Sequence, residues 1–264
     1  MKPVKRQKLN QAAVTLVCAL VFSCVVHGQH PPAVRTPEGM VLVPAGRHTP
    51  LFRAENDPKE VPVSAFFLDT LPVTNGDYLE FIRTNPKWRR SLVKRLFADA
   101  DYLKGWAADL EPGSLAATNS PVTLVSWFAA KAYCEWKGKR LPTTAEWEYA
   151  AAAGLTRADG ENDPEFVRLV RSWYASPALE TLPEVGRSRK NFFGIHDLHG
   201  LTWEWTADFS TAMVTGDARG DTGLDRQLFC GSGSAGAKDT GNFPAFMRYG
   251  FRSSLKASYF YFVT

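Results

Sequence analysis

The chain has 264 residues, of which 45% are hydrophobic, 12% aromatic and 22% charged, with a formal net charge of +4. This composition excludes disordered, collagen-like and coiled-coil proteins, and the length allows one large domain or two small ones. Residues 1–28 hold four basic residues and no acid, so the rest of the chain has 27 residues of each sign. A body without net charge gives no argument for nucleic acid or for an anionic membrane surface as partner.

The N-terminus has the pattern of an export signal. A basic stretch, Lys2–Lys8, precedes an apolar stretch, Ala12–Val26, which is too short to span a bilayer comfortably. We predict a signal peptide over residues 1–28, with cleavage after Gly28. Two alternatives remain open, namely a lipid anchor on Cys24 and an uncleaved anchor. In each case the body is expected to be exported, and so to be periplasmic or secreted, with no membrane span after cleavage.

Two strands and a helix are predicted next. Met40–Gly46 is typical of a strand that ends in a turn, and a second strand is expected over Val61–Leu68. Apolar residues alternate along this second strand at Val61, Val63, Ala65 and Phe67. Thr74, with Asp77 three residues later, predicts a helix start with a capping box. The apolar face of that helix is predicted to hold Tyr78, Phe81 and Ile82.

The middle of the chain predicts two further helices after an irregular stretch. Residues 85–120 are expected to be irregular, with the basic run Lys87–Arg90 as a solvated surface. Ser126 caps a predicted helix over Trp127–Lys137 that ends at Gly138. Thr143 and Glu146 form a capping box for another helix, which continues through Ala153 and stops at Gly154. Loops and short strands are expected from there to the end.

Two cysteines, Cys134 and Cys230, remain after the predicted cleavage site. They allow one disulfide, but the sequence does not show that they meet. Cys134 lies on a predicted helix, where we expect a buried free thiol. No Cys-x-x-Cys motif and no zinc-type spacing of Cys and His occurs.

Several motifs together resemble one known family. Pro121–Trp127 followed by Ala132–Ala151 resembles the formylglycine-generating enzyme, or sulfatase-modifying factor, family. Met40–Gly46 and Phe67–Tyr78 resemble its first strand and helix. Phe193–Trp205 is similar to the family signature Asp-x-x-Gly-Asn-x-Trp-Glu-Trp. The resemblance covers about residues 38–264.

This resemblance implies a fold and a domain. The expected fold is α+β, a C-type-lectin-like formylglycine-generating-enzyme fold with little regular secondary structure, over a domain at residues 38–264. The family usually closes with a strand carrying Asn-x-Gly-Phe-Arg, whereas this sequence stops at Phe262–Thr264. We therefore expect either a shortened C-terminus or the loss of that strand.

A calcium site is the best candidate ligand site in the sequence. Four residues lie close together around a glycine turn: Asp197, Gly200, Thr202 and Glu204. Calcium takes carboxylate and backbone carbonyl oxygens, which the two acids and the two intervening residues would supply. The family resemblance implies calcium at the matching positions. The alternative is a turn in which Asp197 caps backbone N–H groups and Glu204 pairs with an arginine.

The copper centre of the family is not matched. In formylglycine-generating enzymes two cysteines near the C-terminus hold Cu(I), which activates oxygen to oxidise a substrate cysteine. The resemblance aligns Ala235 and Pro244 with these cysteines, and neither residue binds a metal. Four residues keep family positions and define the frame of a catalytic pocket: Ser232, Trp203, Arg248 and Arg252.

Two other metal sets remain open as alternatives. His196 and His199, with Asp197 between them, offer two imidazoles and a carboxylate to iron or copper. The competing interpretation is that His196 packs and His199 belongs to the turn. Cys230 with Met247 would form a soft copper pair.

Three functions follow from these residues. The tail from Cys230 resembles an exported subgroup that includes accessory proteins encoded beside copper nitrite reductases. It implies an accessory or maturation factor that acts on a client protein in the periplasm, without formylglycine-forming activity. The alternatives are a formylglycine-generating or other metal-dependent oxidase and a lectin-like binding module.

Overall fold

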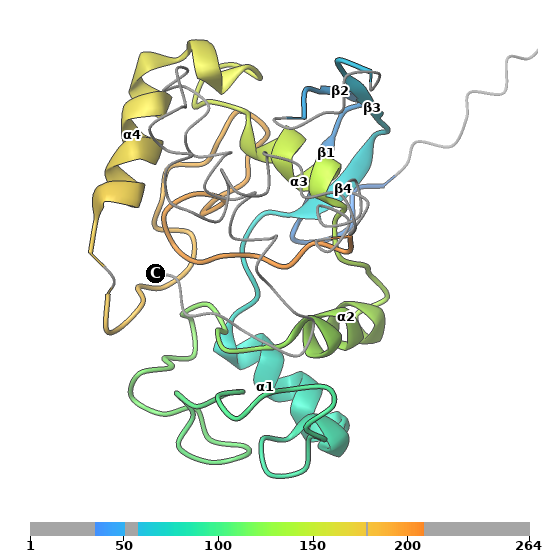
Figure 1. Cartoon of the computed structure of the whole chain (residues 1–264), viewed down its shortest axis with the longest axis vertical. Helices are drawn as coiled ribbons and strands as arrows, with labels where there is room; N and C mark the ends of the chain where they lie inside the picture. Colours follow the sequence, from blue (N-terminus) through green and yellow to red (C-terminus); the bar gives the residue numbers. More distant parts are fainter. Residues whose placement is uncertain (1–34, 51–57, 178, 209–264) are drawn as a thin grey trace, which may run out of the picture. The chain divides into compact units, whose positions relative to one another are not determined.

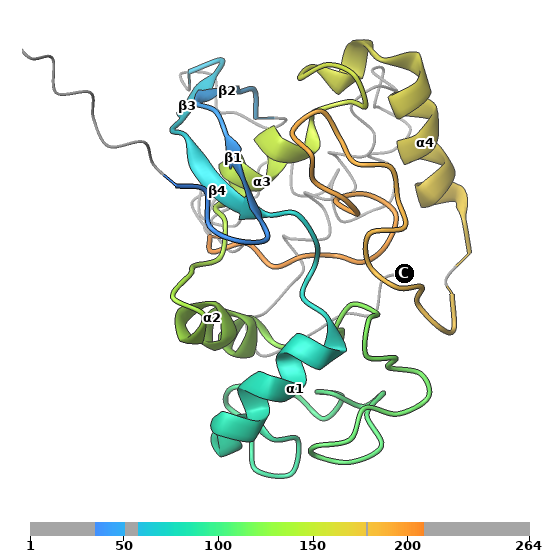
Figure 2. The same ribbon diagram turned by 180° about the vertical axis from the view of Figure 1, so that it is seen from behind.

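The structure, a computed structural model, describes residues 35–50, 58–177 and 179–208. The chain divides into two units, Met1–Arg35 and Thr36–Thr264, and the elements below belong to the second. Short helices and strands are joined by long irregular segments (Figure 1; Figure 2, from behind). This mixture agrees with the predicted α+β class and its low content of regular structure. Within the described ranges, no helix has the length and apolar character that a membrane crossing requires.

The strands form an interrupted antiparallel ribbon. β1 (Met40–Val43) pairs with β4 (Phe66–Asp69), and β2 (Gly46–His48) pairs with β3 (Val61–Val63). The register continues across the interruption, since Val43 lies opposite Phe66 and Gly46 lies opposite Val63.

The predicted single strand over 61–68 is therefore wrong in detail, because residues 64 and 65 separate β3 from β4. Pro44 lies opposite this break and has no N–H to donate, which explains why the ladder stops there. The break also ends the predicted alternation. Ala65 is exposed, and the inward positions are Val63 and Phe66.

α1 (Asn75–Thr84) begins as predicted. The Thr74 hydroxyl accepts from the backbone N–H of Asp77, and the Asp77 carboxylate accepts from that of Thr74. Tyr78, Phe81 and Ile82 are buried, so the predicted apolar face is confirmed. The stretch after α1 is irregular as expected, apart from a short 3-10 turn at Pro86–Trp88 (η1).

α2 (Trp127–Trp136) and α3 (Thr144–Ala151) also begin at their predicted caps, Ser126 and Thr143. α3 ends two residues earlier than expected. The reason lies in Gly160, whose N–H donates to the Ala152 carbonyl at 2.7 Å and turns the chain away. A side chain at Gly160 would meet that same carbonyl at 2.6 Å, so only glycine fits this approach.

The prediction of loops and short strands after α3 is wrong, because α4 (Pro164–Ala175) follows a 3-10 turn at Gly160–Asn162 (η2). The Asp163 carboxylate accepts from the N–H groups of Glu165 and Phe166, and Pro164 occupies the first turn. Asp-Pro-Glu is a strong helix-start signal that the sequence interpretation passed over.

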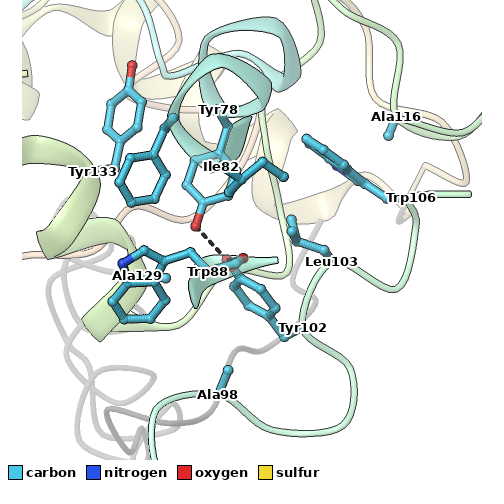
Figure 3. Close-up of a cluster of buried hydrophobic side chains, with 11 residues drawn as sticks. Tyr78, Ile82, Trp88, Ala98, Tyr102, Leu103, Trp106, Ala116, Ala129 and Tyr133 are labelled. Carbon is cyan, nitrogen blue, oxygen red and sulfur yellow. Dashed lines mark hydrogen bonds between the residues drawn. The ribbon is translucent and has the colours of Figure 1, made fainter. Parts of the chain in front are cut away.

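Two buried clusters stabilise the fold. The Tyr78 cluster joins α1, α2 and the loops at 85–120 (Figure 3), and its buried members are Tyr78, Phe81, Ile82, Trp88, Ala98, Tyr102, Leu103, Trp106, Ala116, Ala129 and Tyr133. The Trp147 cluster joins the strands, α3 and a later loop, and its buried members are Val43, Val63, Phe66, Trp147, Ala150, Ala151, Ile195 and Leu198. The second cluster supports the segment that holds the candidate metal residues.

Candidate metal site

Three tryptophan hydrogen bonds hold the segment Trp203–Asp208 against the helices. Trp147 on α3 donates its ring N–H to the Glu204 carboxylate at 2.6 Å, and Trp127 on α2 donates to the Thr206 carbonyl at 2.9 Å. In the opposite direction, Trp205 donates to the Val125 carbonyl just before α2 at 2.9 Å. These aromatic residues therefore serve as hydrogen-bond donors as well as packing groups.

The same segment is fixed to the start of α3. The N–H of Ala207 donates to the Pro142 carbonyl at 2.8 Å, and the Thr144 and Thr206 hydroxyls lie 2.9 Å apart. The Asp208 carboxylate accepts from the backbone N–H of Thr144, in the first turn of α3, at 2.6 Å. The backbone around Glu204 is thus held on both sides.

Asp197 is buried and has a left-handed backbone, with φ of 59°. Its carboxylate accepts from the backbone N–H of Gly186 at 2.5 Å and from that of Ser188 at 3.2 Å. The Asp197 N–H in turn donates to the Ser188 hydroxyl at 2.7 Å. This is the capping role that the sequence offered as the alternative to a metal ligand.

Glu204 is in a different environment. The residue keeps some exposed area, but its carboxylate is enclosed, and this desolvation raises its pKa to about 7. The nearby carboxylates of Asp197 and Asp69 raise the pKa further, whereas the Trp147 hydrogen bond lowers it. The arginine pair that the sequence left open as the alternative is not found among the described residues, where the hydrogen-bond partner of Glu204 is Trp147. An enclosed carboxylate with one neutral donor and two acidic neighbours is the environment that a bound cation would stabilise.

Gly200 and Thr202 lie between the two acids along the chain. Gly200 has a φ of 96°, and a side chain there would approach Trp173 of α4 to 3.2 Å. Trp173 also packs against Trp203, with ring centroids 5.7 Å apart. Both views show the orange segment between α4 and α3 (Figures 1 and 2). α4, which the sequence analysis missed, therefore covers the turn that carries the candidate carbonyl ligands.

The histidine alternative is not supported. The Nδ1 atom of His196 lies 2.7 Å from the carbonyl oxygen of Ser188. The Nε2 atom of His199 lies 2.9 Å from the carbonyl oxygen of Ala151. The His199 ring also packs against the rings of Trp147 and Phe166. Across the described ranges, no group of three or more His, Cys, Asp and Glu is placed to hold a metal ion. This result does not bear on the candidate calcium ligands, because they include two acidic side chains and otherwise backbone carbonyls.

The predicted catalytic frame is described only at Trp203. Ser232, Arg248 and Arg252 lie outside the described residues, as do Cys230, Met247, Ala235 and Pro244. Cys134 on α2 is free, as expected, but it is half-buried against the Tyr78 cluster rather than fully buried. Burial raises the pKa of its thiol to about 11, which keeps the thiol protonated and unreactive at neutral pH.

Sequence reasoning did not find the roles of Trp147 and Ser188. A signal for Trp147 was present, because it lies at the fourth position of a capped helix whose apolar face must turn inward. No local signal points to Ser188, since it lies nine residues from Asp197 in an irregular segment.

One family model spans all the residues that the structure describes. A family model described as the Sulfatase-modifying factor enzyme 1-like domain matches residues 27–260, and the chain belongs to this family.

The relatives of this chain differ in their stated activity. It is 31% identical over 220 residues to the inactive C-alpha-formylglycine-generating enzyme 2 of Mus musculus, covering 69% of this chain and 70% of the relative. It is 30% identical over 217 residues to the formylglycine-generating enzyme of the same species, covering 65% and 58%. It is 30% identical to the serine/threonine-protein kinase pkn1 of Chlamydia caviae, covering 60% of this chain and 25% of the relative. Family membership alone therefore does not decide activity.

Proposed function

We propose that this chain is an exported accessory or maturation factor for a periplasmic enzyme, and that it does not form formylglycine. The observation that carries this proposal is the state of its cysteines. Beyond residue 28 the sequence has two, Cys134 and Cys230. A Cu(I) centre of the family type needs two thiolates, and Cys134 has a raised pKa and packs against the Tyr78 cluster.

The family pattern supports the same conclusion. It aligns Ala235 and Pro244 with the copper-binding cysteines, which leaves Cys230 without a thiolate partner from that pattern. A relative named as inactive matches this chain over a similar length to one named as active. The retained fold is then used for docking to a client protein rather than for oxidation.

We further propose that the segment holds one structural calcium ion. Glu204 and Asp197 would supply carboxylate charge, and Gly200 and Thr202 would supply backbone carbonyls. Support comes from the enclosed Glu204 carboxylate, which has the Trp147 ring N–H as donor and the acidic side chains of Asp197 and Asp69 nearby. Because two hydrogen bonds already occupy the Asp197 carboxylate, its part is mainly electrostatic.

Metal analysis and an activity assay test the proposal together. The chain recovered from an exporting host is purified with calcium, offered Cu(I) and Fe(II) anaerobically, and incubated with a cysteine-containing sulfatase peptide in air. We expect bound calcium, no stoichiometric copper or iron, and an unmodified peptide by mass spectrometry. Conversion of the peptide cysteine to an aldehyde, together with bound copper, would show an active enzyme instead.

The export proposal has its own test. N-terminal sequencing and the intact mass of the recovered chain distinguish cleavage after Gly28 from lipid attachment at Cys24. Recovery of an unprocessed chain in the cytoplasm would contradict both, and a periplasmic client would then be impossible.

A further inference from the structure

Two consecutive turns in the irregular stretch repeat one hydrogen-bond pattern. In Arg89–Val93, the N–H groups of Leu92 and Val93 donate to the Arg89 carbonyl at 3.0 and 2.9 Å. In Lys94–Ala98, those of Phe97 and Ala98 donate to the Lys94 carbonyl at 2.8 and 3.3 Å. Each turn starts with two basic residues and carries one leucine. The outward side chains of these turns, with Lys87 beside them, form what we call the tandem-turn surface.

The turns rest on the buried core. Ala98 is fully buried in the Tyr78 cluster, and Val93 and Phe97 are partly buried against it (Ala98 and the neighbouring Trp88 are labelled in Figure 3). The Phe97 ring packs on Trp88 with centroids 6.2 Å apart. The backbone N–H of Ser91 donates a hydrogen bond to the Asp109 carboxylate at 2.9 Å, and the Ser91 hydroxyl donates to the same carboxylate. The outward side chains are therefore presented from a fixed backbone.

Two large apolar side chains of this surface face solvent. Leu92 is 56% exposed and Leu96 is 74% exposed, the highest value among the exposed large hydrophobic residues of the described chain. Single exposed leucines are ordinary on protein surfaces. Here two of them occur four residues apart, in consecutive turns whose backbone is anchored on the Tyr78 cluster.

Basic residues flank these leucines in the sequence, although the Lys87 amine lies over the Trp88 ring and Arg90 donates to the Trp106 carbonyl. Lys87, Arg90, Lys94 and Arg95 are exposed, and no acidic residue occurs between Pro86 and Ala98. None of the four forms a salt bridge with any residue of the described chain. Acids do lie close: Asp99 and Asp101 follow Ala98, with Asp101 paired to Lys104, and the pKa of Asp109 is lowered mainly by Ser91 and also by Arg89 and Arg90. A body without net charge thus carries a local positive surface, which total composition did not reveal.

We infer that the tandem-turn surface docks on an anionic phospholipid bilayer. The leucines enter the boundary between headgroups and acyl chains while the cations contact lipid phosphates. A bilayer offers anionic charge directly above an apolar layer, which complements leucines that protrude among cations. A hydrophilic polyanion would satisfy the cations but leave both leucines in water. This inference is independent of the calcium site and of the accessory role.

Vesicle co-sedimentation of the full chain, as recovered from an exporting host, tests the charges. We expect binding to mixed phosphatidylglycerol–phosphatidylcholine vesicles that weakens with salt, and little binding to pure phosphatidylcholine vesicles. Each cation near such a surface contributes about fivefold, so Lys94→Glu with Arg95→Glu should lower the partition coefficient by more than about 25-fold. The control pair, Lys59→Glu with Arg168→Glu, changes the net charge equally and should leave binding within about twofold, because distant charges are screened. An equal loss in both pairs would overturn the inference.

The leucines separate a bilayer from a soluble acidic partner. Leu92→Ser with Leu96→Ser should weaken vesicle binding on the order of tenfold, whereas Leu169→Ser on α4, 44% exposed in the native chain, should not. Unchanged urea midpoints establish that the variants remain folded. If the leucine pair binds vesicles as the native chain does while the charge pair fails, the surface recognises anions alone and the bilayer assignment is wrong.

Every variant shares the N-terminal apolar segment, which could itself bind vesicles. A fluorophore placed on the tandem-turn surface tests whether this surface makes the contact. An environment-sensitive fluorophore is attached to Leu96→Cys and, as control, to Leu169→Cys, with the labelled native chain as baseline. Anionic vesicles should shift the emission to the blue at position 96 and not at position 169. Equal shifts at both positions, or none at either, would overturn the inference.

Discussion

The Tyr78 cluster and the segment around Glu204 both enclose polar groups, but they pair them differently. In the Tyr78 cluster the Tyr78 and Tyr102 hydroxyls lie 2.7 Å apart, and Tyr102 donates to the Trp88 carbonyl (Figure 3). Around Glu204 one neutral donor faces a carboxylate with acidic neighbours. The paired hydroxyls of the first region need no group from outside the protein and stabilise the fold, whereas under our proposal a calcium ion would offset the carboxylate charge of the second.

The largest expected effect on stability concerns Asn75, which is hydrogen-bonded to Trp106 of the Tyr78 cluster. The Asn75 amide donates to the carbonyls of Ala117, Ser120 and Pro121 and accepts from the Trp106 ring N–H at 3.0 Å. Asn75→Ala would remove the acceptor of the buried Trp106 ring N–H and one donor from each carbonyl, although the carbonyls of Ala117 and Ser120 keep a backbone N–H donor. We expect a loss of about 3 kcal/mol or more in the free energy of unfolding, measured by urea denaturation.

Asn85→Ala is the matched control, because Asn85 also donates to backbone, at the Phe81 carbonyl, but next to solvent. It should cost about 1 kcal/mol or less. Calcium should alter neither difference. Equal losses in the two variants would show that the Asn75 network adds nothing beyond an ordinary hydrogen bond.

The second prediction concerns the Glu204 carboxylate. Glu204→Gln removes the charge but keeps the shape, so the variant should lose the calcium-dependent rise in melting temperature. A ligand at about one hundred times its dissociation constant stabilises a protein by about 2.7 kcal/mol, and this is the size of the effect expected to disappear. Differential scanning calorimetry with calcium and with chelator measures it.

Without calcium, Glu204→Gln should be at least as stable as the native chain, because repulsion from Asp197 and Asp69 is relieved. Glu184→Gln, at an exposed position, serves as control and should keep the full calcium response. A native chain that melts at the same temperature with calcium and with chelator would remove the calcium proposal while leaving the fold assignment intact.

The third prediction isolates the contact between α4 and the candidate ligand turn. Gly200 and Gly138 both have a positive φ, of 96° and 70° respectively. A Cβ atom added at Gly200 would lie 3.2 Å from Trp173, whereas one added at Gly138 would enter open space. Gly138→Ala should cost about 1 kcal/mol from backbone strain, and Gly200→Ala about 2 kcal/mol, because the contact is added. Urea denaturation compares them.

Calcium sensitivity sharpens this pair. Gly200→Ala should also weaken calcium binding in a titration, whereas Gly138→Ala should not. Identical costs and identical calcium affinities would mean that Trp173 does not constrain the turn.

What the sequence predicted well was local. The caps at Thr74, Ser126 and Thr143 depend on residues three positions apart, and all three are confirmed. The family motifs identified the fold class because their aromatic and turn residues are spaced along the chain. The strand break was missed since Pro44 acts on a partner more than twenty residues away.

The environment of the candidate site was less predictable. Asp197 and Glu204 are close in sequence, but their donors come from Gly186, Ser188 and Trp147, and no local pattern links these positions. α4 was missed for a different reason: its start signal is local, but it was read as part of a loop. The tandem turns were invisible to composition because their positive charge is balanced elsewhere in the body.

The smallest effect tests an ionic cap at the edge of the Glu204 segment. Arg140 donates two hydrogen bonds to Glu146, and these, with the Thr143 backbone, hold the pKa of that carboxyl below its usual value. A depressed folded-state pKa contributes stability above the unfolded value, about 4.3, that is lost as the pH falls through the folded value.

Glu146→Gln keeps the capping hydrogen bond and removes only the charge. Because the Arg140 side chain is 62% exposed, solvent screening limits the cost to about 0.5 kcal/mol at pH 7. Urea midpoints of the two proteins should therefore differ slightly at neutral pH and converge below about pH 4; a difference that grows as the pH falls would mean that the ion pair is not its source.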